Sequence, residues 1–340
     1  MFEKVNAGHP DKMADRLAGA VVDLVYERAG GLTKANPRVA CEVMAGHGRV
    51  DVQIETSLGR LDLRADDVDA LIHRLFGERV EGHVLIAPQD PHLSDNQTRG
   101  LRSKTFESPD GTVDGVSQGQ RVMRCGDNGI FRGVPPTYEQ KVLTALAATM
   151  YENIPYDGKY IINRKFWEED PDYVSYGVTV CQSHASQQEI CMLLSAFEKS
   201  QFDAKGIICP IDEYTINPLG PWTGGINVDC GAVNRKLGSD MGDGVTGGGL
   251  MGKDLSKADV SVNIVCYLKA VASGQVVTAV CSIGDENVTF TYADGRRETE
   301  RFADIVEQAR LYIMTDCNGS FEKFAMWGLV RPLAQVKSEE

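Results

Sequence analysis

The chemistry that this sequence suggests begins in the segment TGGGLMGKDLSKAD, residues 246–259. Its glycines let a backbone come close to a ligand, and Lys253 and Lys257 offer positive charge to an anion. Apolar residues at helical spacing follow, so the segment is predicted to lead into a helix N-terminus, whose unpaired N–H groups favour an anion. Ser256 and Asp259 have capping-box spacing, and ordinary helix capping is therefore the alternative interpretation.

Two phosphate-binding motifs are almost matched here, and both are rejected. Residues 247–253 read G-x-x-x-x-G-K, but Asp254 stands where a P-loop places Ser or Thr on magnesium, and its charge would repel phosphate. Residues 242–247 read G-x-G-x-x-G, but no strand precedes them, as a dinucleotide-binding fingerprint requires. What remains is the prediction of an anion site at the start of the helix.

A second candidate group stands at the start of another predicted helix, in the sequence GHPDK. Pro10 suits the first helical position, and an apolar stripe with helical spacing follows it. His9, Asp11 and Lys12 offer a proton donor, a hard oxygen ligand and a cation, which suit a metal-bound polyphosphate. With an ordinary pKa near ~6.5, His9 would be kept protonated by a nearby phosphate. The alternative is a structural His9, with Asp11 as a complement to the helix dipole.

Two carboxylates fall within predicted strands. Glu42 shares one face of its strand with Ala40 and Met44, and a carboxylate on an apolar face is costly unless a cation meets it. The alternative for Glu42 is an exposed edge position. Glu55 shares its face with polar residues, which favours a solvated position.

Composition limits the class of protein. A chain of 340 residues predicts two or three domains, and a hydrophobic content of 42% is that of a globular protein. The net charge of −13 argues against a general binder of nucleic acid or of anionic membranes. No apolar run approaches the ~20 residues of a membrane span, and no signal core precedes the first charges, so a cytoplasmic protein is expected. The nine cysteines include no C-x-x-C pair and are predicted to be reduced thiols.

The same order of predicted elements, helix, hairpin and helix, occurs three times, starting near residues 10, 137 and 257. At the second start, Thr137 and Gln140 have capping-box spacing. Three α+β units are the expected fold class, each with helices on one face of a small, mostly antiparallel sheet. Turn-rich segments suggest the units 1–110, 111–214 and 215–340.

Six blocks in order carry a family resemblance: EKVNAGHPDK, RVACE with IETS, CGDNGIF, INPLGPWTGG, DCGAVNRK and GGGLMGKDLSKAD. Through them nearly the whole chain resembles the S-adenosylmethionine synthetases (methionine adenosyltransferases). The resemblance implies three intertwined domains of similar topology with pseudo-threefold symmetry. It also implies a homodimer or a dimer of dimers with active sites at the subunit interface. The implied reaction is attack of the L-methionine sulfur on C5′ of ATP, followed by hydrolysis of the triphosphate to pyrophosphate and phosphate.

The resemblance also assigns roles to three sets of residues. Those at the leaving triphosphate, with the histidine at its bridging oxygen, are His9, Lys159, Arg235, Lys236, Lys253 and Lys257. Those that would bind metal, the two aspartates for two Mg²⁺ ions and the glutamate for K⁺, are Asp11, Asp259 and Glu42. Those at the substrates are Glu55, Asp229 and Gln89 for methionine, Asp127 and Glu3 for the ribose, and Trp222 for adenine.

The chain departs from the family pattern in several places. Trp222 stands where the family has Phe, which keeps an aromatic face for stacking. Pro221 replaces an Arg, Ala7 replaces a Glu, and the segment 237–246 is short. Two alternatives to the synthetase are another phosphate-cradling NTPase and a non-catalytic regulatory relative. The first would need Ser or Thr after the lysine at 253, and the second is expected to have lost the histidine or the lysines.

Overall fold

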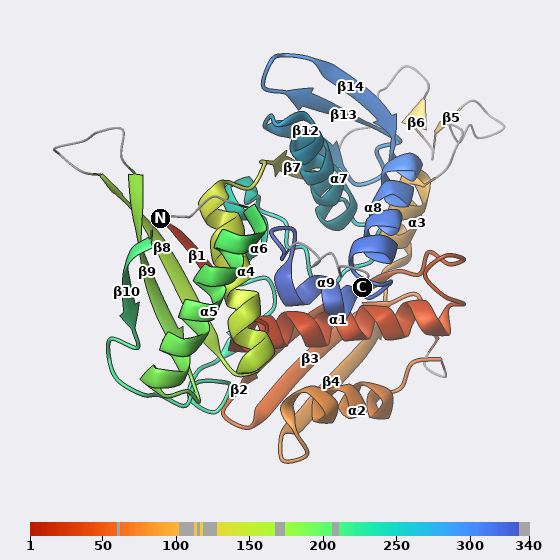
Figure 1. The fold of residues 1–340 in the computed structure, drawn as a ribbon. Helices are drawn as coiled ribbons and strands as arrows, with labels where there is room; N and C mark the ends of the chain where they lie inside the picture. The colour runs from red at the N-terminus through yellow and green to blue at the C-terminus, as the bar shows by residue number, and fades with distance from the viewer. Residues whose placement is uncertain are drawn as a thin grey trace, which may run out of the picture.

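The computed structural model describes residues 1–59, 62–101, 112–113, 116–117, 128–166, 174–205 and 211–332. Within these ranges the chain forms three four-stranded sheets, each with helices against one face, and a short hairpin of β5 (Thr112–Val113) and β6 (Val116–Ser117). Figure 1 shows α1 (Pro10–Arg28) lying across the middle of the molecule, with the three sheets arranged around it.

The first sheet has the order β11-β2-β3-β4. Its strands are β11 (Gly231–Ala232), β2 (Val39–Gly46), β3 (Arg49–Thr56) and β4 (Glu81–Pro88), and its helices are α1 and α2 (Ala65–Phe76). The predicted hairpin is confirmed. Its turn contains His47 at φ 51° and Gly48 at φ 81°, which is the left-handed backbone that such a turn requires.

The second sheet has the order β1-β8-β9-β10. Its strands are β1 (Phe2–Val5), β8 (Gly158–Phe166), β9 (Val174–Gln182) and β10 (Ile211–Ile216), and its helices are α4 (Tyr138–Asn153) and α5 (Gln187–Lys205). The predicted capping box at α4 is confirmed. The Gln140 N–H donates to Thr137 Oγ1 at 3.3 Å, and the Thr137 N–H donates to Gln140 Oε1 at 3.0 Å.

The third sheet has the order β14-β13-β12-β7. Its strands are β7 (Asn128–Gly133), β12 (Val277–Ser282), β13 (Asn287–Tyr292) and β14 (Arg297–Arg301), and its helices are α7 (Ala258–Ser273) and α8 (Phe302–Asp316). β14 comes before its helix and pairs antiparallel with β13, whereas β4 and β10 follow a helix and pair parallel. A helical crossover allows a parallel strand, and a short turn does not.

The three units exchange strands. β1 precedes α1 but pairs with β8, β7 precedes α4 but pairs with β12, and β11 precedes α7 but pairs with β2. Each unit therefore gives its leading strand to the sheet of another unit, which closes a cycle of three. The predicted α+β class with three intertwined, pseudo-threefold units is confirmed. The linear boundaries near residues 110 and 214 stay a prediction.

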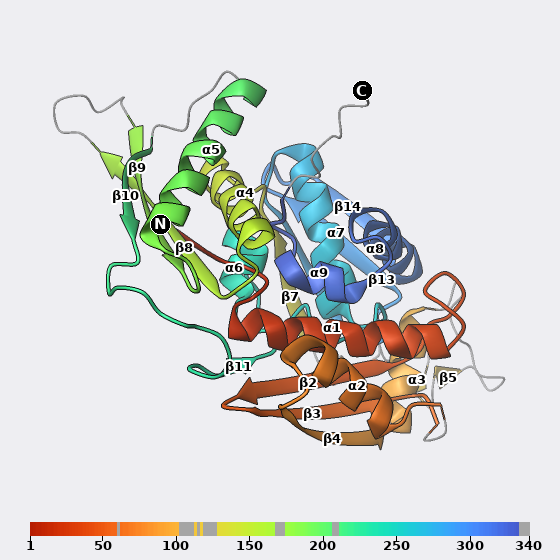
Figure 2. The same ribbon diagram turned by 60° about the horizontal axis from the view of Figure 1, so that its bottom comes forward.

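The core lies on the helix-covered faces of the sheets. Along β2 the residues alternate between buried and outward positions, and the buried face packs on α1 (Figure 2). Glycine is needed at position 19 of α1, because a Cβ there would come within 2.5 Å of the Phe321 carbonyl oxygen of α9 (Phe321–Trp327). Glu42 and Glu55 both lie on the outward face and are exposed. The alternative for Glu42 is therefore right about exposure but wrong about an edge position, because β2 lies between β11 and β3.

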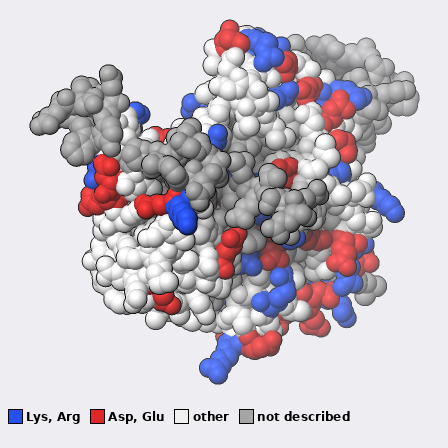
Figure 3. All heavy atoms as spheres, viewed as in Figure 1, with Lys and Arg blue, Asp and Glu red and all other residues white. Residues whose placement is uncertain are grey.

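The outward faces carry exposed apolar side chains. Met44 is 61% exposed, Leu85 58%, Ile130 71% and Val280 49%. On the face seen in Figure 3, acidic and basic side chains are interspersed and do not form one basic patch. The described cysteines are all free, and no helix among the described residues is long and apolar enough to cross a membrane.

Candidate functional site

His9 occupies the N-cap position of α1, where it is 7% exposed. The Asp11 N–H donates to His9 Nδ1 at 3.2 Å, so Nδ1 is an acceptor and the neutral ring carries its proton on Nε2. Burial, followed by the charges of Lys236 and Lys159, lowers the pKa of His9 to about 3. Without a ligand His9 is therefore neutral, because burial and then the surrounding cations disfavour its charge. Its protonation by a bound phosphate stays a prediction.

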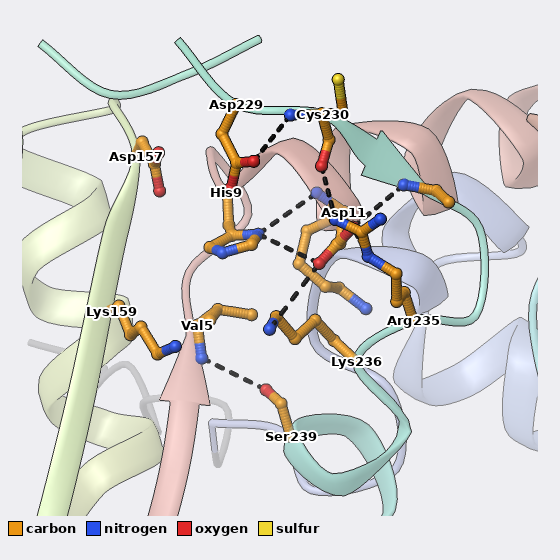
Figure 4. A network of polar contacts seen from close by, with 12 residues as sticks. Val5, His9, Asp11, Asp157, Lys159, Asp229, Cys230, Arg235, Lys236 and Ser239 are labelled. Carbon is orange, nitrogen blue, oxygen red and sulfur yellow. Dashed lines mark hydrogen bonds and ion pairs between the residues drawn. The ribbon is translucent and has the colours of Figure 1, made fainter. Parts of the chain in front are cut away.

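Three cations and two carboxylates form a chain of ion pairs beside His9. Figure 4 shows the part of it around Asp11, Arg235 and Lys236. Arg235 Nε lies 2.9 Å from Asp11 Oδ1, and Lys236 Nζ lies 3.7 Å from Asp11 Oδ2. Lys236 also lies 3.5 Å from Glu3 Oε1, and Lys159 Nζ lies 2.9 Å from Glu3 Oε2. We call His9 and these five residues the first cluster. The structure brings together six predicted site residues, and the outermost of them, Glu3 and Lys236, stand more than 200 positions apart in the sequence.

The segment around β11 positions this cluster. The Ala232 N–H donates to Asp11 Oδ1 at 2.9 Å, which draws the segment against the start of α1. Only glycine fits at position 231, because a Cβ there would lie 2.1 Å from the Pro10 carbonyl oxygen. Lys236 then forms the N-cap residue of the short helix α6 (Leu237–Met241). The DCG motif thus packs against the start of α1, and the RK motif places its two cations, Arg235 and Lys236, beside the buried Asp11 carboxylate.

Lys12 does not belong to this cluster, contrary to the expectation from GHPDK. Its side chain is fully buried, with Nζ 2.9 Å from Asp15 Oδ2 and 2.7 Å from Asp240 Oδ1. One residue further along a helix the side chain turns by about 100°, so Lys12 points into the core while Asp11 faces the cluster. Lys12 is a structural cation.

Asp157 was missed by the sequence analysis. It is only 4% exposed and accepts from the Gly225 N–H at 2.8 Å through Oδ2, while Oδ1 has no hydrogen-bond partner in the described part of the chain. Burial raises the pKa of Asp157 to about 6, against the lowering effect of the Gly225 N–H. Figure 4 places it with Asp229 beside His9. Its only sequence signal is that it stands two residues before Lys159.

We expect Asp157 to give the protein a specific pH dependence of stability. Because its folded pKa is raised above the unfolded value, stability is highest below that value and falls as pH rises through about 6. Asp157→Asn, which keeps an acceptor for Gly225, removes this loss. The gain in unfolding free energy relative to the unchanged chain should grow by roughly 2 kcal/mol between pH 4.5 and pH 8 in urea titrations. A gain that does not vary with pH would contradict the assignment.

A second cluster lies at the start of α7. Lys253 Nζ lies 2.6 Å from Asp259 Oδ2, and Lys257 is the N-cap residue of the helix. The predicted capping box is wrong. Ser256 instead donates to the carboxylate of Asp254, which also accepts from the Val39 N–H. Asp259 is thereby left to pair with Lys253. The second cluster consists of Lys253, Lys257 and Asp259.

Three further predicted residues lie near the second cluster. Lys253 pairs with Ala40 on β2, Glu55 lies opposite Ala40 on β3, and Glu42 is two residues further along β2. Gln89 is buried, and its Nε2 donates to Gln97 Oε1 at 3.0 Å.

A cavity of about 70 Å³ adjoins the second cluster. Polar and apolar side chains both line it, among them Gln97, Lys257, Asp259, Phe131, Ile283 and Phe302. Gln97 is 2% exposed, and its Nε2 has no hydrogen-bond partner among the described residues. A buried donor without a partner at the edge of a cavity indicates a place for a polar ligand group.

The two clusters lie apart within one chain. Met44 of β2 pairs with Ala232, which binds Asp11, and Ala40 of the same strand pairs with Lys253. Four residues of strand separate these positions by roughly 13 Å. Among the described residues, no hydrogen bond or ion pair joins a side chain of one cluster to the other. Asp229 lies with the first cluster and Glu55 near the second, so a single chain does not bring both to one ammonium group.

Two predicted contacts of the nucleoside remain. Asp127 lies outside the described residues. Trp222 is partly exposed and lies in the loop that contains Gly225, whose N–H donates to Asp157. The Trp222 carbonyl oxygen accepts from the His184 N–H at 3.4 Å. Trp222 therefore lies on the same side of the site as Asp157.

The fold and the two clusters define a class: an α+β protein of three intertwined units with fixed cations at two helix starts. No protein-family model matches the chain. An S-adenosylmethionine synthase from Nitratiruptor sp. is 25% identical over 315 residues, covering 86% of this chain and 76% of that protein. One from Syntrophobacter fumaroxidans is 27% identical over 344 residues, covering 90% and 84%.

The fold is also found among solved structures. One of them is described as an unusual S-adenosylmethionine synthetase from Campylobacter jejuni, with a TM-score of 0.61 and 18% identity, covering 96% of this chain and 93% of that one. The sequence resemblance is thereby confirmed. The chain is similar in sequence to S-adenosylmethionine synthases over most of its length, at low identity, and it has the fold of the solved synthetase.

Proposed function

We propose that the chain is a cytoplasmic methionine adenosyltransferase that makes S-adenosyl-L-methionine from ATP and L-methionine and releases pyrophosphate and phosphate. The observation that carries this proposal is the first cluster, where Arg235, Lys236 and Lys159 are held around a buried neutral His9. A polyanion entering this cluster replaces the carboxylates as partner of the cations. The named relatives support the choice of substrates.

The main requirement of this reaction is stabilisation of the leaving triphosphate. The thioether sulfur of methionine is a good neutral nucleophile and needs positioning at C5′, whereas charge develops on the oxygen that departs with the triphosphate. His9 Nε2–H is the hydrogen-bond donor for that oxygen. Arg235, Lys236 and Lys159, with the lysines of the second cluster, hold the phosphates before and after the bond breaks. Fixed cations need no reorganisation during the reaction.

Metal ions fit this site only together with phosphate. Mg²⁺ is usually bound by one or two carboxylates plus substrate phosphates, and among the described residues no three acidic, His or Cys side chains gather as a metal site. Asp11 and Asp259 each offer one carboxylate beside cations, so we propose that they hold two Mg²⁺ ions brought with ATP. Bound Mg²⁺ would neutralise charge on the triphosphate. Glu42, exposed near Lys253, is the proposed K⁺ ligand.

The methionine end of the site combines residues near the second cluster with Asp229, which lies with the first cluster. Glu55 and Asp229 are the proposed partners of the ammonium group, and Gln89 positions Gln97 at the cavity edge. Phe131 and Ile283 give that cavity an apolar lining suited to a thioether side chain.

A complete site requires two copies of the chain. The first cluster of one copy meets the second cluster of the other across a twofold axis, which closes the gap of roughly 13 Å within one chain. The exposed Met44, Leu85, Ile130 and Val280 on the outward sheet faces supply apolar surface for this contact. We therefore propose a homodimer, or a dimer of dimers, as the active form.

The deciding experiment is incubation of the purified chain with ATP, L-methionine, Mg²⁺ and K⁺, with product analysis by mass spectrometry. S-adenosylmethionine, pyrophosphate and phosphate in equal amounts are expected. Phosphate release from ATP without methionine, and without a sulfonium product, would favour another phosphate-binding NTPase. Binding of both substrates without any product would favour a regulatory relative.

Lys253→Met is expected to lower kcat by on the order of 10²-fold or more, with little change in the KM for methionine. The reason is that its ammonium acts on charge that develops in the leaving triphosphate. Steady-state kinetics with varied methionine separates the two constants. Lys269→Met is the matched control, because Lys269 lies on α7, the helix that follows Lys253 in the chain, and pairs with Glu298 and Glu300 outside the site. A raised KM with unchanged kcat would contradict the role of Lys253.

The same variant tests whether the site lies between two copies. In a mixture of inactive His9→Asn and Lys253→Met chains that have been allowed to exchange, half of the dimers are mixed. Each mixed dimer contains one intact site, so about a quarter of the full activity should return. No recovery after exchange would place both clusters in one chain's site.

A further inference from the structure

An aromatic pair beside the first cluster takes no part in the contacts proposed so far. The rings of Tyr156 and His184 stack with centroids 4.2 Å apart and 19° between their planes. Tyr156 is 49% exposed, and His184 is exposed as well. His184 has φ 55°, a left-handed backbone that is uncommon outside glycine and costs free energy. A strained residue that holds its ring on an exposed aromatic neighbour points to a surface kept for a flat ligand.

The pair is fixed to the segment that carries the first cluster. The Tyr156 carbonyl oxygen accepts from Asn6 Nδ2 at 2.9 Å and from Gln182 Nε2 at 3.3 Å. A Cβ at Gly8 would lie 2.7 Å from the Tyr156 carbonyl carbon, so the residue before His9 packs directly on this backbone. The distance between the aromatic surface and the cations is therefore set by rigid contacts.

Polar groups border the aromatic surface. Asp157 follows Tyr156 directly and has the unpartnered Oδ1, and the His184 N–H donates to the Trp222 carbonyl oxygen. A ligand that meets every one of these groups needs a flat ring, a hydroxyl or N–H donor for the carboxylate, and an anionic end for the cations. A nucleoside triphosphate has all three, whereas inorganic triphosphate has only the last.

We propose that Tyr156 and His184 form a stacking surface for the purine base of the nucleoside triphosphate, next to Trp222, and that Tyr156 determines how tightly the base is held. The inference rests on the proposed function only in taking the ligand to be a nucleotide whose phosphates occupy the first cluster. Stacking on an aromatic side chain is favourable for any base and is lost when the ring is truncated.

The test compares two ligands on the full-length chain by titration calorimetry with Mg²⁺: a non-hydrolysable ATP analogue and inorganic triphosphate. Tyr156→Ala should bind the analogue about tenfold more weakly and triphosphate as the unchanged chain does. Tyr156→Phe, which keeps the ring, should restore binding of the analogue. Tyr138→Ala is the matched control, because it truncates another exposed tyrosine, at the start of α4.

The outcomes separate this inference from the proposed function. Equal loss for both ligands, or an unchanged affinity for the analogue, would overturn the stacking surface. Binding of triphosphate but not of the analogue by the unchanged chain would overturn the stacking surface and the proposed function together. If circular dichroism shows that Tyr156→Ala does not fold, the same two titrations are carried out on His184→Ala, for which the same results are expected.

Discussion

Replacing Lys12 by methionine is expected to lower the free energy of unfolding by about 3–5 kcal/mol, as measured by urea titration. The Lys12 ammonium is the partner of two fully buried carboxylates, Asp15 and Asp240. Burial disfavours its charge, but the two carboxylates raise the pKa of Lys12 above its ordinary value. Without the lysine, two negative charges in the core lose their partner, and this uncompensated charge is the cause of the loss.

The loss of unfolding free energy caused by Lys12→Met should be larger at pH 8 than at pH 5.5. Burial already raises the pKa of Asp15 to about 7, so this carboxyl can take up a proton and remove one charge at lower pH. A raised folded pKa gives stability that is lost as pH rises through it. Lys12→Met combined with Asp15→Asn should recover part of the loss, because one charge of each sign is then removed.

An exposed ion pair of similar length provides the control for Lys12. Lys165 Nζ lies 2.7 Å from Glu213 Oε2 on the outward face of the second sheet, and both side chains are more than a third exposed. Lys165→Met is expected to cost less than about 1 kcal/mol. A comparable loss in both variants would mean that methionine at these positions, rather than the buried charge, causes the effect.

Local patterns predicted most elements of this fold but not their partners. The alternation in β2 and β3, the hairpin that they form and the capping box of α4 depend on residues within a few positions of each other, and all were confirmed. The pairing of β1 with β8 joins residues about 160 positions apart, and nothing in either segment specifies the other. The exchange of leading strands was therefore known only from the family resemblance.

The errors at the site have the same origin. Lys12 was assigned to the site because it stands beside Asp11, but its direction is set by Asp240, more than 220 residues away. Ser256 donates to Asp254 and therefore does not cap the helix. The Asp254 carboxylate is held in place by the Val39 N–H, which comes from another unit. Asp157 and His9 owe their pKa shifts to burial by other units. Residue types indicated the chemistry, and long-range packing decided which side chains face it.

The second prediction with a large effect concerns His9. His9→Asn is expected to slow sulfonium formation by on the order of 10²-fold, while hydrolysis of added triphosphate continues at a comparable rate. Asparagine can still accept from the Asp11 N–H and cap α1, so the helix start and the ion pairs of Asp11 are preserved. What is lost is the Nε2–H donor. His73→Asn, on α2 and away from both clusters, is the control.

Two assays on one variant separate the two half-reactions: sulfonium product from ATP and methionine, and phosphate from triphosphate alone. Breaking the C5′–O bond places new charge on one oxygen, which the neutral imidazole can meet with a hydrogen bond. Hydrolysis of free triphosphate does not involve that bond and depends on the cations, which remain. The Nε2–H donor is present on the neutral tautomer and on the protonated ring alike, so the expectation does not depend on the charge of His9. An equal loss in both assays would instead mean that His9 mainly maintains the arrangement of the first cluster.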